Sequence, residues 1–552
     1  MYQFYLNLQP NLPAVLPSIF MKFNATQIPY QATGLFSQLV RDYVEANGTA
    51  MDYVNYAPHV DGVQKAIAAR KNFPTNRKLL HSVLHAQYAT LNSEKAVADN
   101  VELLLQENTF VITTAHQPNI FTGPLYFFYK IIHAIQMAAD LKKKFPENNY
   151  VPMYYMGSED ADIDEVGSFY LGGTPFSWQT KQSGAIGRMK VDDALLSLLK
   201  NMEGYWQTLP QGKDAMDALQ KAYQKGRTIN EATLHLVHIF FGKYGLVVIQ
   251  PDDAKLKSSF VSVMEKELTT QFSNKALQPT LEKLKTDYHV QTEGRVINLF
   301  YLKDNTRSRI ELKEGVYSIV DSDIQFTKAQ IIAELHEHPE RFSPNVILRG
   351  LYQETILPGI VFIGGGGELA YWMELKNVFA EAGVHFPLLQ LRNSFLCISQ
   401  KMVKQWANLG FDLADVFKPI LNLEAEYVNA HTENSLSLSD SINALEKLYQ
   451  TIRNQVNKVD ATLGDHTMNL SVQSVKKLLE LEKKILKAEK RKQATSIERI
   501  RTIKNELFPQ NSLQERVENF VEWVGVYGWD WVHAIMVNSN SLEQRFTIIT
   551  EE

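Results

Sequence analysis

Five short apolar segments are the feature that most constrains what this chain can fold into. Each is rich in β-branched and aromatic residues and is bounded by Gly, Pro or Asp, so each is expected to form a buried strand. Amphipathic helical patterns lie between them, and this alternation predicts an α/β fold with a parallel sheet covered on both faces. Ligands bind such sheets at the carboxyl ends of the strands, near the point where the strand order reverses. The segments are 109–114, 150–157, 245–253, 359–367 and 386–392.

Two other regions interrupt this alternation. Residues 294–320 have the pattern of three short strands with polar turns, which predicts an inserted β-meander. From Ile442 the apolar residues recur in steps of three and four, and a second such pattern follows residues 465–471. We expect an antiparallel helical hairpin that turns at 465–471, and no strands after about Asn393. The predicted domains are an α/β core over 1–392 with its insertion at about 290–322, a helical coiled-coil domain over 393–510, and a C-terminal segment over 511–552 that packs back on the core.

Composition excludes several classes of protein. The net charge of −5 argues against a dedicated nucleic-acid binder. Cys397 is the only cysteine, which excludes an intramolecular disulfide and a cysteine-based zinc site and fits a reducing cytoplasm. No apolar run reaches the roughly 18 residues of a membrane-spanning helix. The segment before Lys22, the first basic residue, lacks the positive start of a secretory signal, so none is expected.

The stretch "AHQPNIFTGPLYFFYKI" (115–131) joins a predicted strand to a predicted helix. This junction suits an anionic ligand, because it combines a strand's carboxyl end with the N–H groups of a helix N-terminus. Thr122 can cap the helix, Gly123 permits close backbone approach, and Pro124 fits the first helical position. These three residues therefore also have a purely structural explanation. His116 and Asn119 are harder to explain as core residues, and we interpret both as ligand-facing.

The stretch "MGSEDADIDEV" (156–166) again follows a predicted strand. Its crowded carboxylates repel one another unless cations, amide donors or solvent screen them, so a divalent metal and a substrate ammonium group are both candidates. The spacing is not that of an EF-hand, and we assign no metal ligands. A solvated acidic loop is the alternative interpretation. The candidate residues are Glu159, Asp160 and Asp162.

Four consecutive glycines, 364–367, follow another predicted strand and precede a helix that opens with Glu368. Their N–H groups could cradle a ligand, although the motif is neither GxGxxG nor a Walker loop, and a tight strand-to-helix turn is the alternative. Aromatic residues one turn later could wall the pocket, and upstream Arg349 and Glu354 could contact a carboxylate and an amine. The candidate residues are Arg349, Glu354, Gly365, Gly366, Glu368, Tyr371 and Trp372.

These blocks together resemble the cysteine-adding enzymes of bacillithiol biosynthesis. The resemblance rests on the three stretches above and on "FSPNVILRGLYQETILP", "PLLQLRNSF" and "FPQNSLQERVENF", which occur in family order and span most of the chain. It implies a Rossmann-like catalytic core related to nucleotidylyl transferases and class I synthetases. It also implies connecting-peptide insertions, an antiparallel coiled-coil domain and a homodimer formed through that domain.

The resemblance also implies a reaction, in which the carboxyl of L-cysteine is joined to the amine of glucosaminyl-malate. ATP and Mg²⁺ are the candidate cofactors, and the expected location is the cytoplasm, with no nucleic-acid or membrane partner. His116, Asn119 and Thr122 would bind phosphate or an oxyanion, and Arg349 and Arg392 the malyl carboxylates. The implied catalytic residues are His116, Glu159, Asp160 and Asp162.

Two other classes of function stay open. The chain could be another nucleotidyl-transferase or synthetase-like, ATP-dependent amino-acid ligase, which ATP–pyrophosphate exchange across amino acids would identify. It could instead be a non-catalytic coiled-coil scaffold. The polar clusters at the strand ends are complete rather than eroded, which favours an enzyme.

Overall fold

The computed structural model describes residues 23–303, 305–432 and 436–552. The chain forms two compact units, one from Met1–Cys397 with Ser512–Glu552 and the other from Ile398–Asn511. The domain boundaries expected after residues 392 and 510 lie within a few residues of these limits. The expectation of no secretory signal concerns residues 1–22, which lie outside the described residues. No helix in the described ranges is both long and apolar enough to span a membrane.

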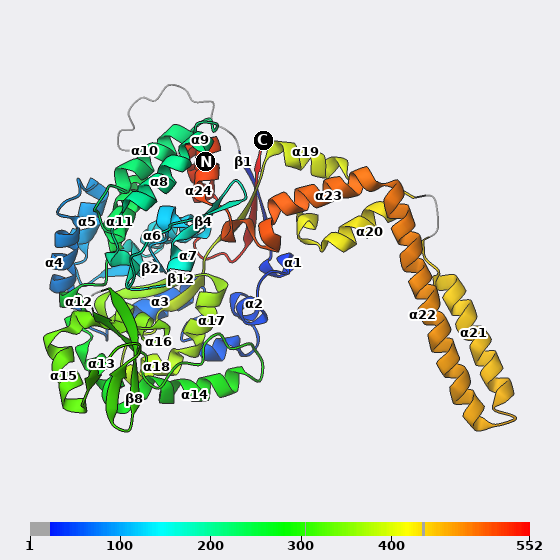
Figure 1. Ribbon diagram of the computed structural model, residues 1–552, viewed down its shortest axis with the longest axis horizontal. Helices are drawn as coiled ribbons and strands as arrows, with labels where there is room; N and C mark the ends of the chain where they lie inside the picture. The colour runs from blue at the N-terminus through cyan, green and yellow to red at the C-terminus, as the bar shows by residue number, and fades with distance from the viewer. Residues whose placement is uncertain (1–22, 304, 433–435) are drawn as a thin grey trace. The chain divides into compact units, whose positions relative to one another are not determined.

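A five-stranded parallel sheet forms the centre of the first unit, and each predicted apolar segment contributes one strand (Figure 1). The spatial order is β13–β12–β2–β3–β6, so in chain order the strands read 3-2-1-4-5 from β6 to β13. This is the order of a Rossmann fold, and it reverses between β2 and β12. The strands are β2 (Thr109–His116), β3 (Asn149–Met156), β6 (Val247–Ile249), β12 (Gly359–Gly364) and β13 (Leu388–Leu391).

Helices cover both faces of this sheet, as predicted. On one face α3 (Val60–Arg70) and α6 (Tyr126–Lys144) pack their apolar residues onto Phe110 and Ile112 of β2. On the other face Trp372 of α17 (Gly366–Glu374) stacks on Phe362 of β12, with ring centroids 4.2 Å apart. Side chains point alternately to the two faces of a strand, and because helices cover both faces, both sets are buried. The polar residues of the candidate site lie instead at the strand ends.

The predicted meander is present as an antiparallel run of β7 (Leu299–Lys303), β8 (Thr306–Lys313) and β9 (Val316–Ile319). Two further strands, β10 (Gln325–Phe326) and β11 (Phe342–Pro344), extend it to five strands in the order β10–β9–β8–β7–β11. This insertion lies between β6 and β12 in sequence.

The expectation that strands stop at about Asn393 is wrong. β14 (Ser394–Ile398) follows at once, and β15 (Phe546–Glu551) joins it to β1 (Phe23–Ile28) in a three-stranded sheet. β15 pairs with β1 in antiparallel register, Phe23 opposite Glu551. Such a pairing between the two ends of the chain leaves no periodic signal in the sequence between them.

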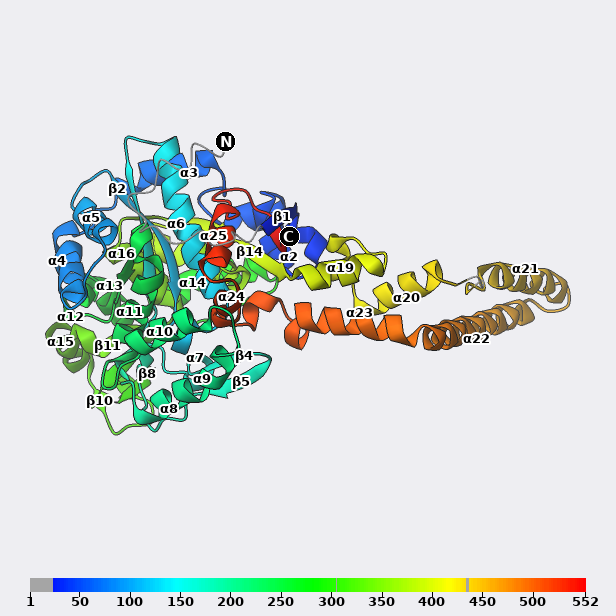
Figure 2. The ribbon, with the colours of Figure 1, turned by 90° about the horizontal axis from the view of Figure 1, so that it is seen from above.

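The second unit is helical, with a coiled-coil arm. Figures 1 and 2 show α21 (Ser439–Val456) and α22 (Ala461–Lys492) running side by side in opposite directions. The predicted turn at 465–471 is wrong, because these residues lie inside α22. The chain turns instead at 457–460, where the Asp460 carboxylate accepts from Thr462 N–H at 2.8 Å and caps α22. The remaining helices are α19 (Gln400–Asn408), α20 (Ile420–Ala430) and α23 (Ala494–Leu507).

Candidate functional site

Two cavities lie at the carboxyl ends of the central strands, and Gln117 and Arg349 line both. The switch-point cavity, of about 510 Å³, lies where the strand order reverses. The meander cavity, of about 650 Å³, lies beside it, towards β3 and β7. The switch-point cavity is further lined by His116, Tyr126, Lys130, Glu165, Gly365, Gly366, Gly367, Glu368, Tyr371, Arg392 and Arg516. The meander cavity is further lined by residues that include Glu159, Asp160, Arg295, Phe300, Arg307 and Asn345.

His116 is the last residue of β2 and is held rigidly. Its backbone oxygen accepts hydrogen bonds from Gly157 N–H at 2.7 Å and from the Tyr154 hydroxyl at 3.1 Å. The imidazole is buried against Tyr126, and its Nε2 has no hydrogen-bond partner among the described residues. Burial, and then the nearby positive charges beginning with Lys130, lower the pKa of His116 well below its usual value. His116 therefore lines the cavity as a neutral imidazole whose Nε2 is itself buried, and a buried polar atom without a partner needs an explanation.

The N-terminus of α17 forms the opposite wall. Glu368 accepts from Gly365 N–H at 2.8 Å, which caps the helix, and also forms an ion pair with Lys130. Lys130 is only 3% exposed and donates to the Ala115 carbonyl at 3.0 Å. A Cβ added at Gly367 would meet nothing within 4 Å, so the backbone there borders open space. Helix N–H groups beside a buried lysine suit an anion.

Arg349 and Arg392 differ in how many of their hydrogen-bond donors remain available for a ligand. Arg349 donates to the Tyr371 hydroxyl at 2.8 Å, and no carboxylate of the described residues forms an ion pair with it. Arg392 is buried, pairs with Glu515 at 2.6 Å and donates to the Ser394 hydroxyl at 3.2 Å. A guanidinium already bonded on one edge has less capacity for a ligand. Arg349 is therefore the arginine that can receive a carboxylate.

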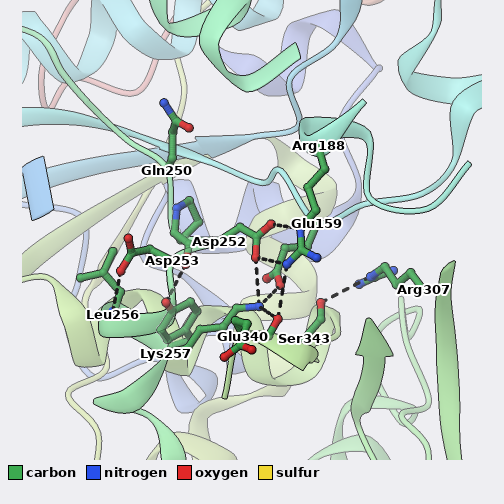
Figure 3. Close-up of polar contacts among 12 residues, drawn as sticks. Glu159, Arg188, Gln250, Asp252, Asp253, Leu256, Lys257, Arg307, Glu340 and Ser343 are labelled. Carbon is green, nitrogen blue, oxygen red and sulfur yellow. Dashed lines mark hydrogen bonds and ion pairs between the residues drawn. The ribbon is translucent and has the colours of Figure 1, made fainter. Parts of the chain in front are cut away.

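Glu159 belongs to a buried network beneath the meander cavity (Figure 3). It pairs with Lys257, whose ammonium also lies 3.2 Å from Asp252. Arg188 contacts Asp252 with two nitrogens, at 2.6 and 2.7 Å. Burial raises the pKa of Glu159, while Lys257 opposes the rise. Two carboxylates thus face two cations, and Glu159 is held in one orientation.

Asp160, beside Glu159, is less buried. It accepts from the Gln117 amide at 3.2 Å and from Ala161 N–H at 2.8 Å, which leaves capacity for a ligand. Arg307 lines the same cavity, and its guanidinium lies 3.8 Å from the Phe300 ring centroid. The meander cavity therefore offers both a carboxylate and a guanidinium, which suits a ligand that carries an amine and a carboxylate.

Comparison with known proteins identifies the family. Residues 21–393 match the family model described as Bacillithiol biosynthesis BshC, N-terminal Rossmann-like domain, and residues 395–551 match the C-terminal coiled-coil domain of BshC. The chain belongs to the BshC family. A BshC relative from Flavobacterium johnsoniae is 39% identical over 95% of this chain and 99% of its own length. Relatives from Christiangramia forsetii and Bacillus cereus are 37% and 24% identical, over 95% and 96% of this chain and 98% and 100% of their own lengths. All three are described as "Putative cysteine ligase BshC".

Several predicted residues of this BshC chain line neither cavity. Thr122 does not cap α6, which begins at Tyr126 after an N-cap, Leu125, that makes no side-chain hydrogen bond. Pro124 likewise lies two residues before the helix. Thr122 instead sits in a tight loop with positive φ, where Asn519 donates to the backbone oxygens of Phe121 and Gly123. Asn119 packs in this loop too, against Gly123. Its Oδ1 and the Thr122 hydroxyl are buried with no hydrogen-bond partner among the described residues, so the predicted ligand contacts of these two residues stay predictions.

Three more predicted residues have structural surroundings. Asp162 is exposed and caps the short α7 (Ile163–Val166) by accepting from Glu165 N–H. Glu354 is buried beside Gly359, the first residue of β12, at the opposite end of the sheet from the cavities. Trp372 is part of the core, as its stacking on Phe362 requires.

Residues that sequence reasoning missed complete the site. Asp252 follows β6, so the rule that located Glu159 at a strand end also applies to it. Lys257 lies in α12 (Ala254–Ser258) and Arg307 in β8. Neither has a local signal, because an isolated basic residue in a helix or meander has the pattern of a surface position.

Proposed function

We propose that this chain joins the carboxyl of L-cysteine to the amine of glucosaminyl-malate, which forms bacillithiol in the last step of its biosynthesis. The observation that carries the proposal is the pair of adjoining cavities with Arg349 and Gln117 as a shared wall. An amide ligase must bring an activated carboxyl to an amine, and one anion-binding cavity beside a second cavity that offers both carboxylates and guanidinium groups suits that task. The relatives described as cysteine ligases support the same reaction.

The switch-point cavity fits the phosphates of ATP. Lys130, the N-terminus of α17 and the His116 imidazole line this cavity and form a suitable set of contacts. ATP, when bound, supplies the activation that a free carboxylate needs for amide formation. Mg²⁺ would accompany the phosphates, since it binds mainly through phosphate oxygens and water with few protein ligands. His116 would contact a phosphate or the developing oxyanion as a neutral group.

The meander cavity fits glucosaminyl-malate. Arg307 and Arg349 would bind the malyl carboxylates, as guanidinium groups do in two-point contacts. Glu159 is fixed by Lys257 and would attract the substrate ammonium group. The amine must lose a proton before it attacks, and Asp160 would accept that proton. Asp160 is oriented by its hydrogen bond from Gln117 and is more exposed than Glu159. We further propose that the chain acts in the cytoplasm as a homodimer formed through α21 and α22.

Mass spectrometry of the product tests this proposal. Purified protein is incubated with L-cysteine and glucosaminyl-malate, with and without ATP and Mg²⁺, and bacillithiol is expected only in the complete mixture. Asp160→Asn should lower the rate by about 100-fold or more while its circular dichroism spectrum stays unchanged. Asp164→Asn is the matched control, because Asp164 is exposed and lines neither cavity.

Three outcomes would contradict parts of the proposal. Full activity of Asp160→Asn would remove this carboxylate from the reaction. Product formed without ATP would contradict the assignment of ATP as the cofactor bound in the switch-point cavity. ATP–pyrophosphate exchange that depends on another amino acid and not on cysteine would identify a different amino-acid ligase.

A further inference from the structure

A cluster of three side chains lies away from both cavities, on two neighbouring helices. His81 and His85 are one turn apart on α4 (Arg77–Tyr88), so their side chains lie on the same helix face. Glu102 reaches them from α5 (Lys95–Leu103), which packs beside α4 (Figures 1 and 2). Its Oε1 lies 2.9 Å from Nε2 of His81 and 3.0 Å from Nε2 of His85. The two rings and the carboxylate thus point to one spot.

We propose that His81, His85 and Glu102 bind a zinc ion. One ligand atom from each residue lies within 4.8 Å of the others. Ligands around a tetrahedral zinc ion are about 3.3 Å apart, so the Nε2–Oε1 distances need to grow by only a few tenths of an ångström. Two imidazoles with one carboxylate form a set that favours zinc and other late first-row metals over Mg²⁺ or Ca²⁺.

The surroundings of the cluster favour uptake from solvent. The His81 side chain is 20% exposed and is therefore anchored, while His85 and Glu102, at 62% and 58%, can adjust around an ion. Three protein ligands leave one tetrahedral position for water or another small ligand.

The pattern "HSVLH" (81–85) differs from that of the zinc hydrolases. Those enzymes place a glutamate directly after the first histidine as general base, whereas Ser82 stands here and donates to the Leu79 carbonyl. The proposal is therefore a metal-binding site without hydrolytic activity. Because its residues line neither cavity, it can be removed without touching the residues proposed for ligation.

Calorimetric titration tests the site. The full chain is freed of metal with a chelator, dialysed into thiol-free buffer and titrated with zinc chloride. The wild-type chain is expected to bind one equivalent, and Co²⁺ at the same site should give the visible absorption of a tetrahedral complex. His85→Ala and Glu102→Gln should each lower the zinc affinity by more than ~10-fold, the loss that even an outer-shell change can cause.

His336→Ala is the matched control. The His336 side chain is 55% exposed, against 62% for His85, and pairs with one carboxylate, Glu265, at 2.8 Å. It belongs to no group of three possible metal ligands among the described residues. It should bind zinc as the wild type does, and thermal unfolding should show that all three variants fold. Absence of zinc binding by the wild type at micromolar concentration would overturn the proposal. Equal affinities of His85→Ala and His336→Ala would overturn it as well.

Discussion

At the scale of single residues, Glu354 shows how burial alone can set the chemistry of a carboxyl group. It is 1% exposed, and its Oε2 has no hydrogen-bond partner within the part of the chain that the structure describes. Burial raises the pKa of Glu354 to about 7, although Arg70 and a hydrogen bond from Gln353 oppose the rise. This carboxyl is therefore a core group with a titration near neutral pH, rather than a contact for a substrate amine.

Glu354→Gln is expected to change how stability depends on pH. The pKa of Glu354 is raised in the folded chain, so its contribution to stability is fully present below pH ~4.5 and is lost as pH rises through about 7. Between pH ~5.5 and ~8 this group should lower the free energy of unfolding by roughly 2 kcal/mol, and the amide should remove that decrease. Urea unfolding at both pH values measures the effect. The control is Glu337→Gln, which changes an exposed carboxyl. If the free energy of unfolding of Glu354→Gln depended on pH as that of the wild type does, the raised pKa would be contradicted.

Single residues of the site were predictable mainly where they follow a strand directly or lie in the motifs beside it, as Arg349, Glu368 and Tyr371 do. His116, Glu159, Asp160 and Gly365 come at the ends of strands whose apolar runs are plain in the sequence, and all four line a cavity. The other half of the meander cavity comes from distant segments such as Arg307. Its contribution depends on how an inserted sheet folds over the core, and a single sequence contains no signal for that.

At the scale of elements, the parallel strands were predictable and the helical turn was not. Each strand is a continuous apolar run, which buried parallel strands require. Residues 465–471 are rich in Asp, Asn and Ser, which favour turns through side-chain hydrogen bonds, but contain no Gly or Pro to enforce one. Inside α22 Asp465 and Asn469 are exposed, Thr467 bonds back to the preceding turn, and Ser471 is buried.

Proline substitution distinguishes the predicted position of the turn, 465–471, from the observed one, 457–460. Asn469 is exposed and lies inside α22, so Asn469→Pro should destabilise the helical unit by about 3 kcal/mol through the lost hydrogen bond and the clash with the preceding turn. Ala461 is the first residue of α22, where proline is tolerated, and Ala461→Pro should be nearly neutral. Thermal unfolding followed at 222 nm measures both. A neutral Asn469→Pro with a destabilised Ala461→Pro would restore the turn at 465–471.

At the scale of the whole molecule, the C-terminal segment completes the first unit after the chain has passed through the helical one. Glu515 pairs with Arg392, Arg516 lines the switch-point cavity, and β15 pairs with β1. Asn519 also holds the loop that follows β2. The first unit therefore depends on residues from both ends of the sequence, and every residue given as lining the two cavities belongs to that unit.

The coiled-coil arm leads to a prediction about assembly. α21 has no buried residue, and α22 exposes Val472 and Leu479, at 67% and 45%, seven residues apart and so on one face. Exposed apolar side chains at heptad spacing favour pairing with a second copy. Light scattering coupled to gel filtration should show a dimer for the wild type and a monomer for the double variant Val472→Lys with Leu479→Lys.

The matched control for this prediction substitutes Gln473 and Glu480, which are exposed, polar and also seven residues apart. Their double substitution by lysine should leave the dimer intact. A wild-type monomer would contradict the prediction, and a dimer that survives the first pair of substitutions would place the contact elsewhere. The substituted residues belong to the second unit and the lining residues of both cavities to the first, so we expect the monomeric variant to form product at the wild-type rate per chain. Assembly and ligation can then be tested separately.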